Sequence, residues 1–410
     1  MEAVAYIAED DSIAPEQKAA LLDENLTHLC EALDALAEHA LIPREHVARE
    51  KRRLNLPSSV IAAAGPVSAP PSLLVQIVDI QRAIGRQPPA AAEAAAAASV
   101  LPPVVSVSRI IGLRVYDAKS TQDIDRDRLR LARREGEPPT GDPAVDETYD
   151  AMGITLNFFA EVYDAPLRPA GRWLEAVVHY GSAFDNTFWD GTRLIVGDGD
   201  GKLFGRFSAC LDIIAHELSH ELTSQAALKF VGQSGALSES ICDVFGILVK
   251  QWHLGMTAES DEWVIGAGLF LPSVHAAGLR SLALPGTAYD DPVLGKDPQG
   301  SHMREFVTTP TDNGGVHINC GIPNNAFFKL ARSLGGSAWE GAGLIWHKTV
   351  TSGALTPATT FAAFGGATVG MSQHIFGDGS VEADATRDAW LDVGVTPLLS
   401  KRAAAVIEAL

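Results

Sequence analysis

The sequence predicts an α+β protein of two lobes, in which a sheet-bearing half is followed by a helical half and one helix joins them. Two observations support this class. Between about residues 110 and 196, short β-type apolar segments alternate with turn-rich loops. After residue 210, apolar residues recur at helical spacing almost to the C-terminus. Strands followed by a run of helices are typical of α+β architectures.

The segment that precedes the sheet-bearing half is expected to be mostly helical. Leucines recur at helical spacing between residues 21 and 36, and a second helical pattern spans residues 72–84. The low-complexity stretch RQPPAAAEAAAAASVLPP (86–103), which contains two proline pairs, is typical of a helix or spacer between units. We therefore expect an N-terminal segment at 1–110, a first lobe at 111–232 and a second lobe at 233–410.

Within the two lobes, the elements follow from periodicity and turn signals. Strands are predicted in IIGLRVYDA (110–118), at 174–180 and at 192–196, with the turn-rich DNTFWDG (185–191) before the last of them. Helices are predicted at 143–163, 211–225, 236–253, 322–334, 339–349, 355–375 and 380–392.

Charge and composition exclude several classes of partner. The chain has 51 acidic residues against 32 lysines and arginines, a net charge of -19, which argues against nucleic acid or an anionic membrane surface. No segment approaches the roughly 20 apolar residues that cross a bilayer. The N-terminus lacks the basic and apolar regions of a secretory signal, and the four cysteines form no CxxC pair. We expect a protein that is cytoplasmic, or exported without a classical signal peptide, with free thiols.

The stretch DIIAHELSHELT (212–223) carries the pattern with the clearest chemistry. His216 and His220 are four residues apart, so on a helix both can face one cation. Glu217 lies beside the first histidine and can hold a water molecule instead of the metal. This HExxH pattern is only moderately specific by itself, because a surface helix with unrelated histidines has the same letters. Catalytic zinc needs a third protein ligand.

The segment QSGALSESICDVFG (233–246) places two carboxylates downstream of HExxH. It predicts a helix with Glu239 and Asp243 one turn apart. With HExxH at this distance upstream, the chain resembles the thermolysin family of neutral zinc metallopeptidases. VYDA (115–118), EGEPPTGDPAVDETYD (135–150) and VHYGSAFDNTFWDG (178–191) are most similar to its protealysin-like branch. The resemblance implies a thermolysin-like fold, one catalytic Zn²⁺ with Glu239 as third ligand, and Asp243 as the carboxylate that orients His216.

The same resemblance implies the remaining roles. TDNGGVHINCGIPNNAFF (311–328) is similar to the segment that places a histidine at the developing oxyanion, so His317 would stabilise that charge and Asp312 would orient it. Glu217 would act as general base in peptide-bond hydrolysis. DNTFWDG looks like the edge strand that binds an extended peptide. The implied substrate-binding residues, which favour an apolar residue at P1′, are Asn186, Thr187, Trp189, Phe204, Phe207, Ile213, Leu279 and Arg280.

The chain departs from the family pattern at the oxyanion site. Alignment from QSGAL places Phe230 where the family usually has a tyrosine whose hydroxyl helps to bind the oxyanion. We therefore expect slow turnover, since zinc and His317 are retained. The alternative is a weakly active or inactive peptidase-fold protein that acts as a binding or regulatory module through its N-terminal segment.

A second departure concerns calcium. Of the acidic cluster that binds paired calcium ions in thermolysin, Asp212 and Glu262 remain, whereas Lys250, Val264 and Ala267 occupy other acidic positions. Two calcium ions need many oxygen ligands, so the paired site is expected to be absent, with calcium elsewhere still open. We expect Lys250 to pair with Asp212 in its place.

Residues 1–110 match the family's pro-segments poorly, and two interpretations compete. The segment is either an inhibitory propeptide that covers the cleft until it is cut, as in a zymogen, or a retained regulatory or docking domain. The candidate partners are a peptide or protein substrate, the chain's own N-terminal segment in the cleft, and a protein inhibitor.

Overall fold

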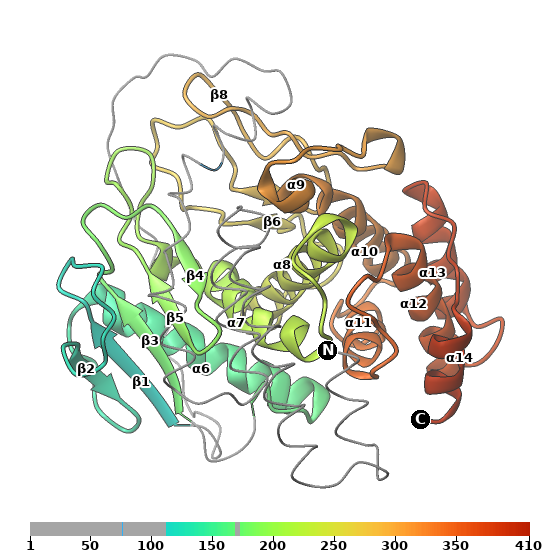
Figure 1. The fold of residues 1–410 in the computed structure, drawn as a ribbon, viewed down its shortest axis with the longest axis horizontal. Coiled ribbons are helices and arrows are strands. Elements are labelled where there is room, and N and C mark those ends of the chain that lie inside the picture. Colours follow the sequence, from blue (N-terminus) through green and yellow to red (C-terminus); the bar gives the residue numbers. More distant parts are fainter. Residues whose placement is uncertain (1–75, 77–111, 169–172) are drawn as a thin grey trace, which may run out of the picture. The chain divides into compact units, whose positions relative to one another are not determined.

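The first lobe of the computed structural model contains a five-stranded sheet (Figure 1). The structure describes residues 76, 112–168 and 173–410, all within the second of two units, Pro71–Leu410. The sheet has the order β2-β1-β3-β5-β4 and comprises β1 (Gly112–Asp117), β2 (Arg130–Arg134), β3 (Trp173–Val178), β4 (Thr187–Trp189) and β5 (Arg193–Val196). Strands β1, β3 and β5 run parallel, and the edge strands β2 and β4 pair antiparallel. Apart from residue 76, the expectations for residues 1–110 lie outside the described residues.

Helix α6 (Pro143–Tyr163) packs against β1, β2 and β3. It begins where Asp142 caps it, accepting a hydrogen bond from the backbone N–H of Ala144, with Pro143 as the first helical residue. It ends at Asp164, which adopts the left-handed conformation. Its buried face joins the sheet to the core of the molecule.

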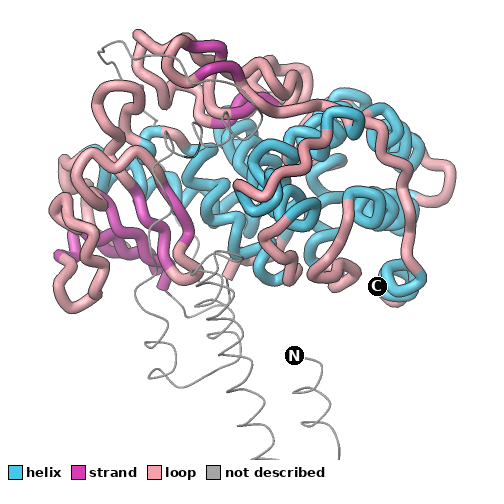
Figure 2. Tube along the Cα trace, turned by 45° about the horizontal axis from the view of Figure 1, so that its top comes forward, coloured by secondary structure: helices cyan, strands magenta, loops and turns pink. Residues whose placement is uncertain are grey.

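Helices α7 (Leu211–Gln225) and α8 (Gly232–Leu254) form the centre of the described part, between the sheet and the later helices (Figures 1 and 2). They pack directly against each other. Gly246 permits this contact, because a Cβ there would lie 2.5 Å from the carbonyl oxygen of Asp212. The prediction of two helices here is confirmed, although α8 begins four residues before the expected 236.

The helical lobe follows. Its helices are α9 (Asp312–Asn319), α10 (Gly321–Leu334), α11 (Ala342–Thr351), α12 (Phe361–Phe376), α13 (Val381–Asp392) and α14 (Lys401–Glu408). Its short elements are η2 (Met303–Glu305), β6 (Val264–Ile265), β7 (Arg280–Ser281), β8 (Asp290–Asp291) and β9 (Gly295–Lys296), whereas the short helix η1 (Phe207–Ala209) belongs to the first lobe and precedes α7. The indole rings of Trp346 and Trp390 stack in its core, with centroids 5.9 Å apart.

The start of one predicted helix was wrong. A helix was expected from residue 355, but α12 begins at Phe361. The side chain of Thr360 caps it by accepting the backbone N–H of Ala363, and Pro357 precedes the cap in a turn. The apolar pattern extended across this loop and hid the capping residue.

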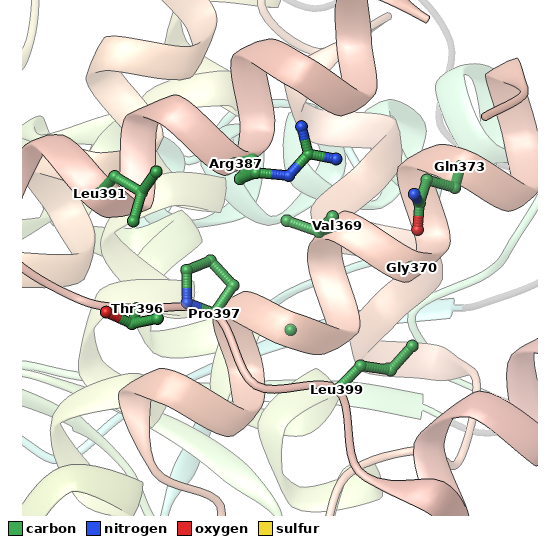
Figure 3. Close-up of a pocket in the computed structure, with 9 residues that line it drawn as sticks. Val369, Gly370, Gln373, Arg387, Leu391, Thr396, Pro397 and Leu399 are labelled. Atoms are coloured by element: carbon green, nitrogen blue, oxygen red, sulfur yellow. The ribbon is translucent and has the colours of Figure 1, made fainter. Parts of the chain in front are cut away.

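A small pocket of about 220 Å³ lies on the helical lobe, between α12, α13 and the segment that leads to α14 (Figure 3). Val369, Leu391 and Pro397 give it an apolar lining, with Arg387 at its edge. None of the candidate site residues contributes to this lining. Within the described residues, no helix combines the length and apolarity that crossing a bilayer requires.

Candidate active site

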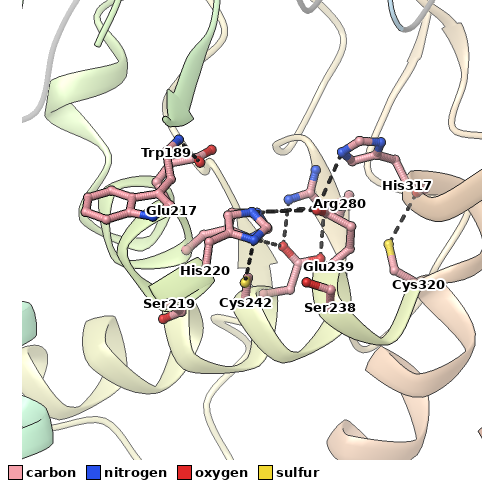
Figure 4. Close-up of polar contacts among 12 residues, drawn as sticks. Trp189, Glu217, Ser219, His220, Ser238, Glu239, Cys242, Arg280, His317 and Cys320 are labelled. Carbon is pink, nitrogen blue, oxygen red and sulfur yellow. Dashed lines mark hydrogen bonds and ion pairs between the residues drawn. The ribbon is translucent and has the colours of Figure 1, made fainter. Parts of the chain in front are cut away.

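The three predicted metal ligands converge between α7 and α8. Figure 4 shows two of them, His220 and Glu239, close together. His216 and His220 lie one turn apart on α7, and Glu239 faces them from α8. Oε2 of Glu239 is 3.4 Å from Nε2 of His216, and Oε1 is 3.6 Å from Nε2 of His220. Glu239 is only 1% exposed. Two imidazole nitrogens and one carboxylate match the donor set of a catalytic zinc site that keeps an open position.

Asp243 holds the other side of His216. Its Oδ1 lies 2.8 Å from Nδ1 of His216 and 2.6 Å from a guanidinium nitrogen of Arg280. Its Oδ2 accepts hydrogen bonds from Nε of Arg280 at 2.8 Å and from Nδ2 of Asn324 at 2.9 Å. Burial would raise the pKa of Asp243, but Arg280 and His216 outweigh it and hold that pKa well below its usual range. Asp243 is therefore a carboxylate in contact with the His216 ring, and the orienting role that the resemblance implies for it stays a prediction.

The charges of this cluster favour a cation. Burial would lower the pKa of His216, but hydrogen bonds to Asp243 and Glu239 outweigh burial and raise it to about 10. Despite its burial, Glu239 has a pKa well below the usual range because His317, His216 and His220 surround it. Buried carboxylates need compensating positive charge. Protonated histidines supply this charge when no metal is bound, and a divalent ion on the Nε2 atoms would supply it instead.

Glu217 follows the first histidine and points towards the edge strand of the sheet (Figure 4). Its Oε2 accepts a hydrogen bond from the backbone N–H of Trp189 at 3.0 Å. Burial raises the pKa of Glu217 to about 7, with His216 opposing and Glu239 adding to the shift. A carboxyl group with a pKa near neutrality can both take and return a proton.

An unusual backbone turn places His317. Asp312 (φ 51°), Asn313 (φ 48°), Gly314 (φ 86°) and Gly315 (φ 78°) all adopt left-handed conformations, which these residue types tolerate best. The turn brings Asp312 back onto His317: Oδ2 accepts its backbone N–H at 2.9 Å, and Oδ1 lies 2.5 Å from Nδ1. Nε2 of His317 then lies 3.3 Å from Glu239. The side chain is 29% exposed, so it can meet a bound substrate.

The predicted substrate strand is an edge strand. Strand β4 pairs with β5 at the end of the sheet. Thr187 Oγ1 donates to the carbonyl of Ile195 at 2.8 Å, and Asn186 Oδ1 accepts the backbone N–H of Thr187 at 2.9 Å. These contacts fix the strand, whose other edge is where an added peptide strand would pair.

The predicted pocket residues lie beside α7. Gly266 adopts a positive φ of 70°, and a Cβ there would lie 3.1 Å from both Ile213 and Leu279, so these two side chains flank one point of the backbone. Phe204 and Phe207 are fully buried, and their rings stack with centroids 6.1 Å apart. The structure thus gathers apolar side chains next to the metal-ligand helix, and their contact with substrate stays a prediction.

Phe230 lies next to two active-site histidines. Its ring centroid is 6.2 Å from that of His220 and 6.1 Å from that of His317, both nearly perpendicular. This position agrees with the expectation that it replaces a residue of the oxyanion site. The aromatic ring offers no hydrogen-bond donor there.

The predicted pairing of Lys250 with Asp212 is confirmed. Nζ of Lys250 lies 3.5 Å from Oδ2 of Asp212 and 3.2 Å from Oε2 of Glu262. The buried Asp212 carboxylate also accepts the backbone N–H of Gly266 at 3.0 Å. The ammonium group therefore neutralises the Asp212 carboxylate, which in turn holds the backbone of Gly266 beside the side chains of Ile213 and Leu279.

The sequence analysis missed two residues of the site. Asn324 donates to Asp243, and Cys242 contacts His220, with Sγ 3.4 Å from Nδ1. Asn324 follows His317 by seven residues, which is two helical turns, and Cys242 follows Glu239 by three. These spacings were the available signals. The described cysteines, Cys210, Cys242 and Cys320, are free and buried, in agreement with the expected free thiols.

Comparison with known proteins agrees with this geometry. Residues 108–224 match the description "Thermolysin metallopeptidase, catalytic domain", and residues 226–395 match "Thermolysin metallopeptidase, alpha-helical domain". The fold and the cluster on α7 and α8 thus define a metallopeptidase of two lobes. The chain belongs to the thermolysin family of zinc metallopeptidases.

The individual relatives point to one branch of that family. An extracellular metalloprotease of Pectobacterium carotovorum subsp. carotovorum is 46% identical over 283 residues, covering 68% of this chain and 80% of its own. Protease PrtS of Photorhabdus sp. (strain Az29) is 45% identical over 293 residues, covering 70% and 78%. The solved precursor of protealysin from Serratia proteamaculans is 42% identical with a TM-score of 0.67, covering 72% of this chain and 91% of its own.

These relationships establish the activity. The protein is a zinc-dependent endopeptidase, and its substrates are peptides or proteins. The predicted family, protealysin-like likeness, fold class and enzyme class are confirmed.

Proposed function

We propose that His216, His220 and Glu239 hold the single catalytic zinc ion of this endopeptidase. The observation that carries the proposal is the approach of both Nε2 atoms to one buried carboxylate, at 3.4 and 3.6 Å. Zinc held there supplies Lewis-acid chemistry, polarising the scissile carbonyl and making water a better nucleophile.

Glu217 is the proposed proton carrier. Its carboxylate takes a proton from the attacking water and delivers it to the amine that leaves. His317, held by Asp312, donates a hydrogen bond from Nε2 to the carbonyl oxygen as negative charge develops. The protein thus supplies a base on one side of the scissile bond and a hydrogen-bond donor on the other.

The substrate is proposed to bind as an extra strand on β4. Backbone hydrogen bonds from an extended peptide depend little on side chains, so selectivity comes from the pocket after the scissile bond. Phe204, Phe207, Ile213 and Leu279 are apolar, which favours leucine or phenylalanine at P1′. Asn186, Thr187, Trp189 and Arg280 complete the proposed substrate-binding set. Asn186 and Thr187 would bind the peptide backbone, and Arg280, whose guanidinium group also bonds Asp243, would contact the substrate carbonyl beside the pocket.

One experiment tests the metal and the chemistry together. Zinc content is measured on the purified protein, together with cleavage of a quenched peptide that has Leu or Phe at P1′. The proposal expects one zinc per chain, retained in Glu217→Gln and lost in Glu239→Gln. Cleavage is expected to slow about 10²- to 10⁴-fold in Glu217→Gln and to be abolished in Glu239→Gln. Zinc retention by Glu239→Gln at wild-type affinity contradicts the assigned ligand set.

We also propose that residues 1–110 form a segment separate from the lobes at 111–232 and 233–410, and that it inhibits the cleft until it is cut. The solved relative is described as a precursor, which supports a zymogen, and the relatives named as extracellular support export. Mass spectrometry of wild type and Glu217→Gln separates the alternatives. A cut that disappears in the variant indicates self-processing; an uncut, fully active wild type indicates a retained regulatory domain.

We propose further that the paired-calcium site near the active centre is absent. The Lys250 ammonium group, within 3.5 Å of two carboxylates, stands where dications would otherwise balance Asp212 and Glu262. Calcium binding elsewhere in the chain is tested by calcium titration. Control by a protein inhibitor is a separate proposal, tested by inhibition of peptide cleavage.

A further inference from the structure

The three active-site histidines differ in what holds their Nδ1 atoms. Nδ1 of His216 lies 2.8 Å from a carboxylate oxygen of Asp243, and Nδ1 of His317 lies 2.5 Å from one of Asp312. Nδ1 of His220 instead contacts the sulfur of Cys242 at 3.4 Å (Figure 4). A metal-bound imidazole generally depends on such a partner to fix its tautomer and ring orientation.

Cys242 is well placed for this role. It is fully buried on α8, three residues after Glu239 and directly before Asp243. One helix therefore presents the proposed ligand and the Nδ1 partners of both α7 histidines.

Direct ligation by Cys242 is the competing interpretation. Donor atoms of His216, His220 and Cys242 lie within 4.8 Å of one another, and such a group could hold a metal ion. However, the sulfur contacts Nδ1 of His220, whereas Glu239 contacts Nε2 of both histidines. The two nitrogens of one imidazole ring point in divergent directions, so one ion cannot use both. Glu239 and the two Nε2 atoms bring three donors together, whereas the Cys242 thiol lies on the Nδ1 side of the His220 ring.

We propose that Cys242 is a positioning residue for zinc binding: its sulfur accepts the Nδ1–H of His220 and so directs the Nε2 lone pair towards the metal. This inference rests on the proposed zinc site. A thiol is a weaker acceptor than a carboxylate, so Cys242 is a different kind of partner from Asp243.

The test measures zinc affinity, independently of catalysis. Zinc-free full-length protein competes with a chromophoric chelator for zinc, as wild type and as Cys242→Ala, Cys242→Ser and Cys210→Ser. Loss of an outer partner typically weakens metal binding about 10- to 100-fold, and Cys242→Ala is expected within this range. Cys242→Ser keeps an acceptor and is expected to recover most of the affinity. Cys210→Ser is the control, since Cys210 is buried but begins α7 away from the histidines.

Each result is decisive. Wild-type protein without tight zinc binding contradicts the proposed function itself. Tight binding by wild type with equal affinity in Cys242→Ala overturns only the positioning role. Because Cys242→Ala could fold poorly, the cobalt-substituted wild type gives a second reading. No thiolate-to-cobalt charge-transfer band is expected, and such a band would show that Cys242 is a ligand and overturn the inference.

Discussion

The backbone N–H of Trp189 donates a hydrogen bond to Oε2 of Glu217 at 3.0 Å, which joins the edge strand of the sheet to the proposed base. The contact links strand β4, the proposed substrate-binding strand, to helix α7, which carries the proposed metal ligands. In the proposed mechanism, the same contact would therefore position both the peptide and the group that takes the proton.

Replacement of Glu217 by glutamine is expected to lower kcat about 10²- to 10⁴-fold, because the amide still accepts the Trp189 N–H but cannot take a proton. Zinc affinity and KM are expected to change little. Steady-state kinetics on the quenched peptide, with metal analysis of the same samples, measure both effects. A variant that keeps more than a tenth of the wild-type kcat would show that another group is the base.

Replacement of Phe230 by tyrosine is expected to raise kcat, up to about 10²- to 10³-fold if the new hydroxyl reaches the developing oxyanion. The ring already lies between His220 and His317, so no large rearrangement is needed. Phe230→Leu is the matched control and gains no donor. Equal kcat in the tyrosine variant and wild type would show that His317 and zinc suffice at this site.

Replacement of Lys250 by methionine is expected to destabilise the fold by roughly 3 kcal/mol, because it leaves the buried Asp212 carboxylate without its cation. Guanidinium unfolding measures this, with the exposed Lys401→Met as control. Added calcium is expected to cause no rise in the Tm of the wild type that depends on Asp212. A large calcium-dependent rise in Tm that disappears in Asp212→Asn would contradict the ion-pair account.

His347 is expected to make the protein sensitive to acid. Its ring stacks on Tyr163 with centroids 4.2 Å apart, and burial, with a contribution from Lys348, lowers its pKa to about 4. Between pH 6.5 and 4 the unfolded chain binds a proton that the folded chain does not, so stability falls as pH is lowered through this window. In His347→Leu, the free energy of unfolding is expected to fall by about 3 kcal/mol less than in the wild type over this pH window. The prediction is contradicted if the free energy of unfolding depends on pH in the same way in the wild type and in His347→Leu.

The sequence predicted which side chains the structure brings together at the proposed metal site better than it predicted their surroundings. The spacing of His216 and His220 needs only helical geometry, and Glu239 followed from its distance to them together with the family resemblance. The spacings of Cys242 and Asn324 place them near the site, but their contacts depend on how α8 and α10 pack against their neighbours, which spacing alone does not determine. For the same reason, the capping turn before α12 was hidden within an apolar run.

Backbone conformation was the other hidden feature. The letters DNGG at 312–315 are all residues that tolerate positive φ, but the motif alone does not predict that four of them in a row adopt it. Four consecutive left-handed residues there allow Asp312 to contact both the backbone and the ring of His317.

The most direct test of the central claim is an anomalous-difference map, recorded at the zinc absorption edge from crystals of the full-length protein. The account predicts one strong peak at about 2.0–2.2 Å from Nε2 of His216, Nε2 of His220 and a carboxylate oxygen of Glu239. A peak bonded to the sulfur of Cys242, or a map with no peak at this site in crystals of active enzyme, would contradict it.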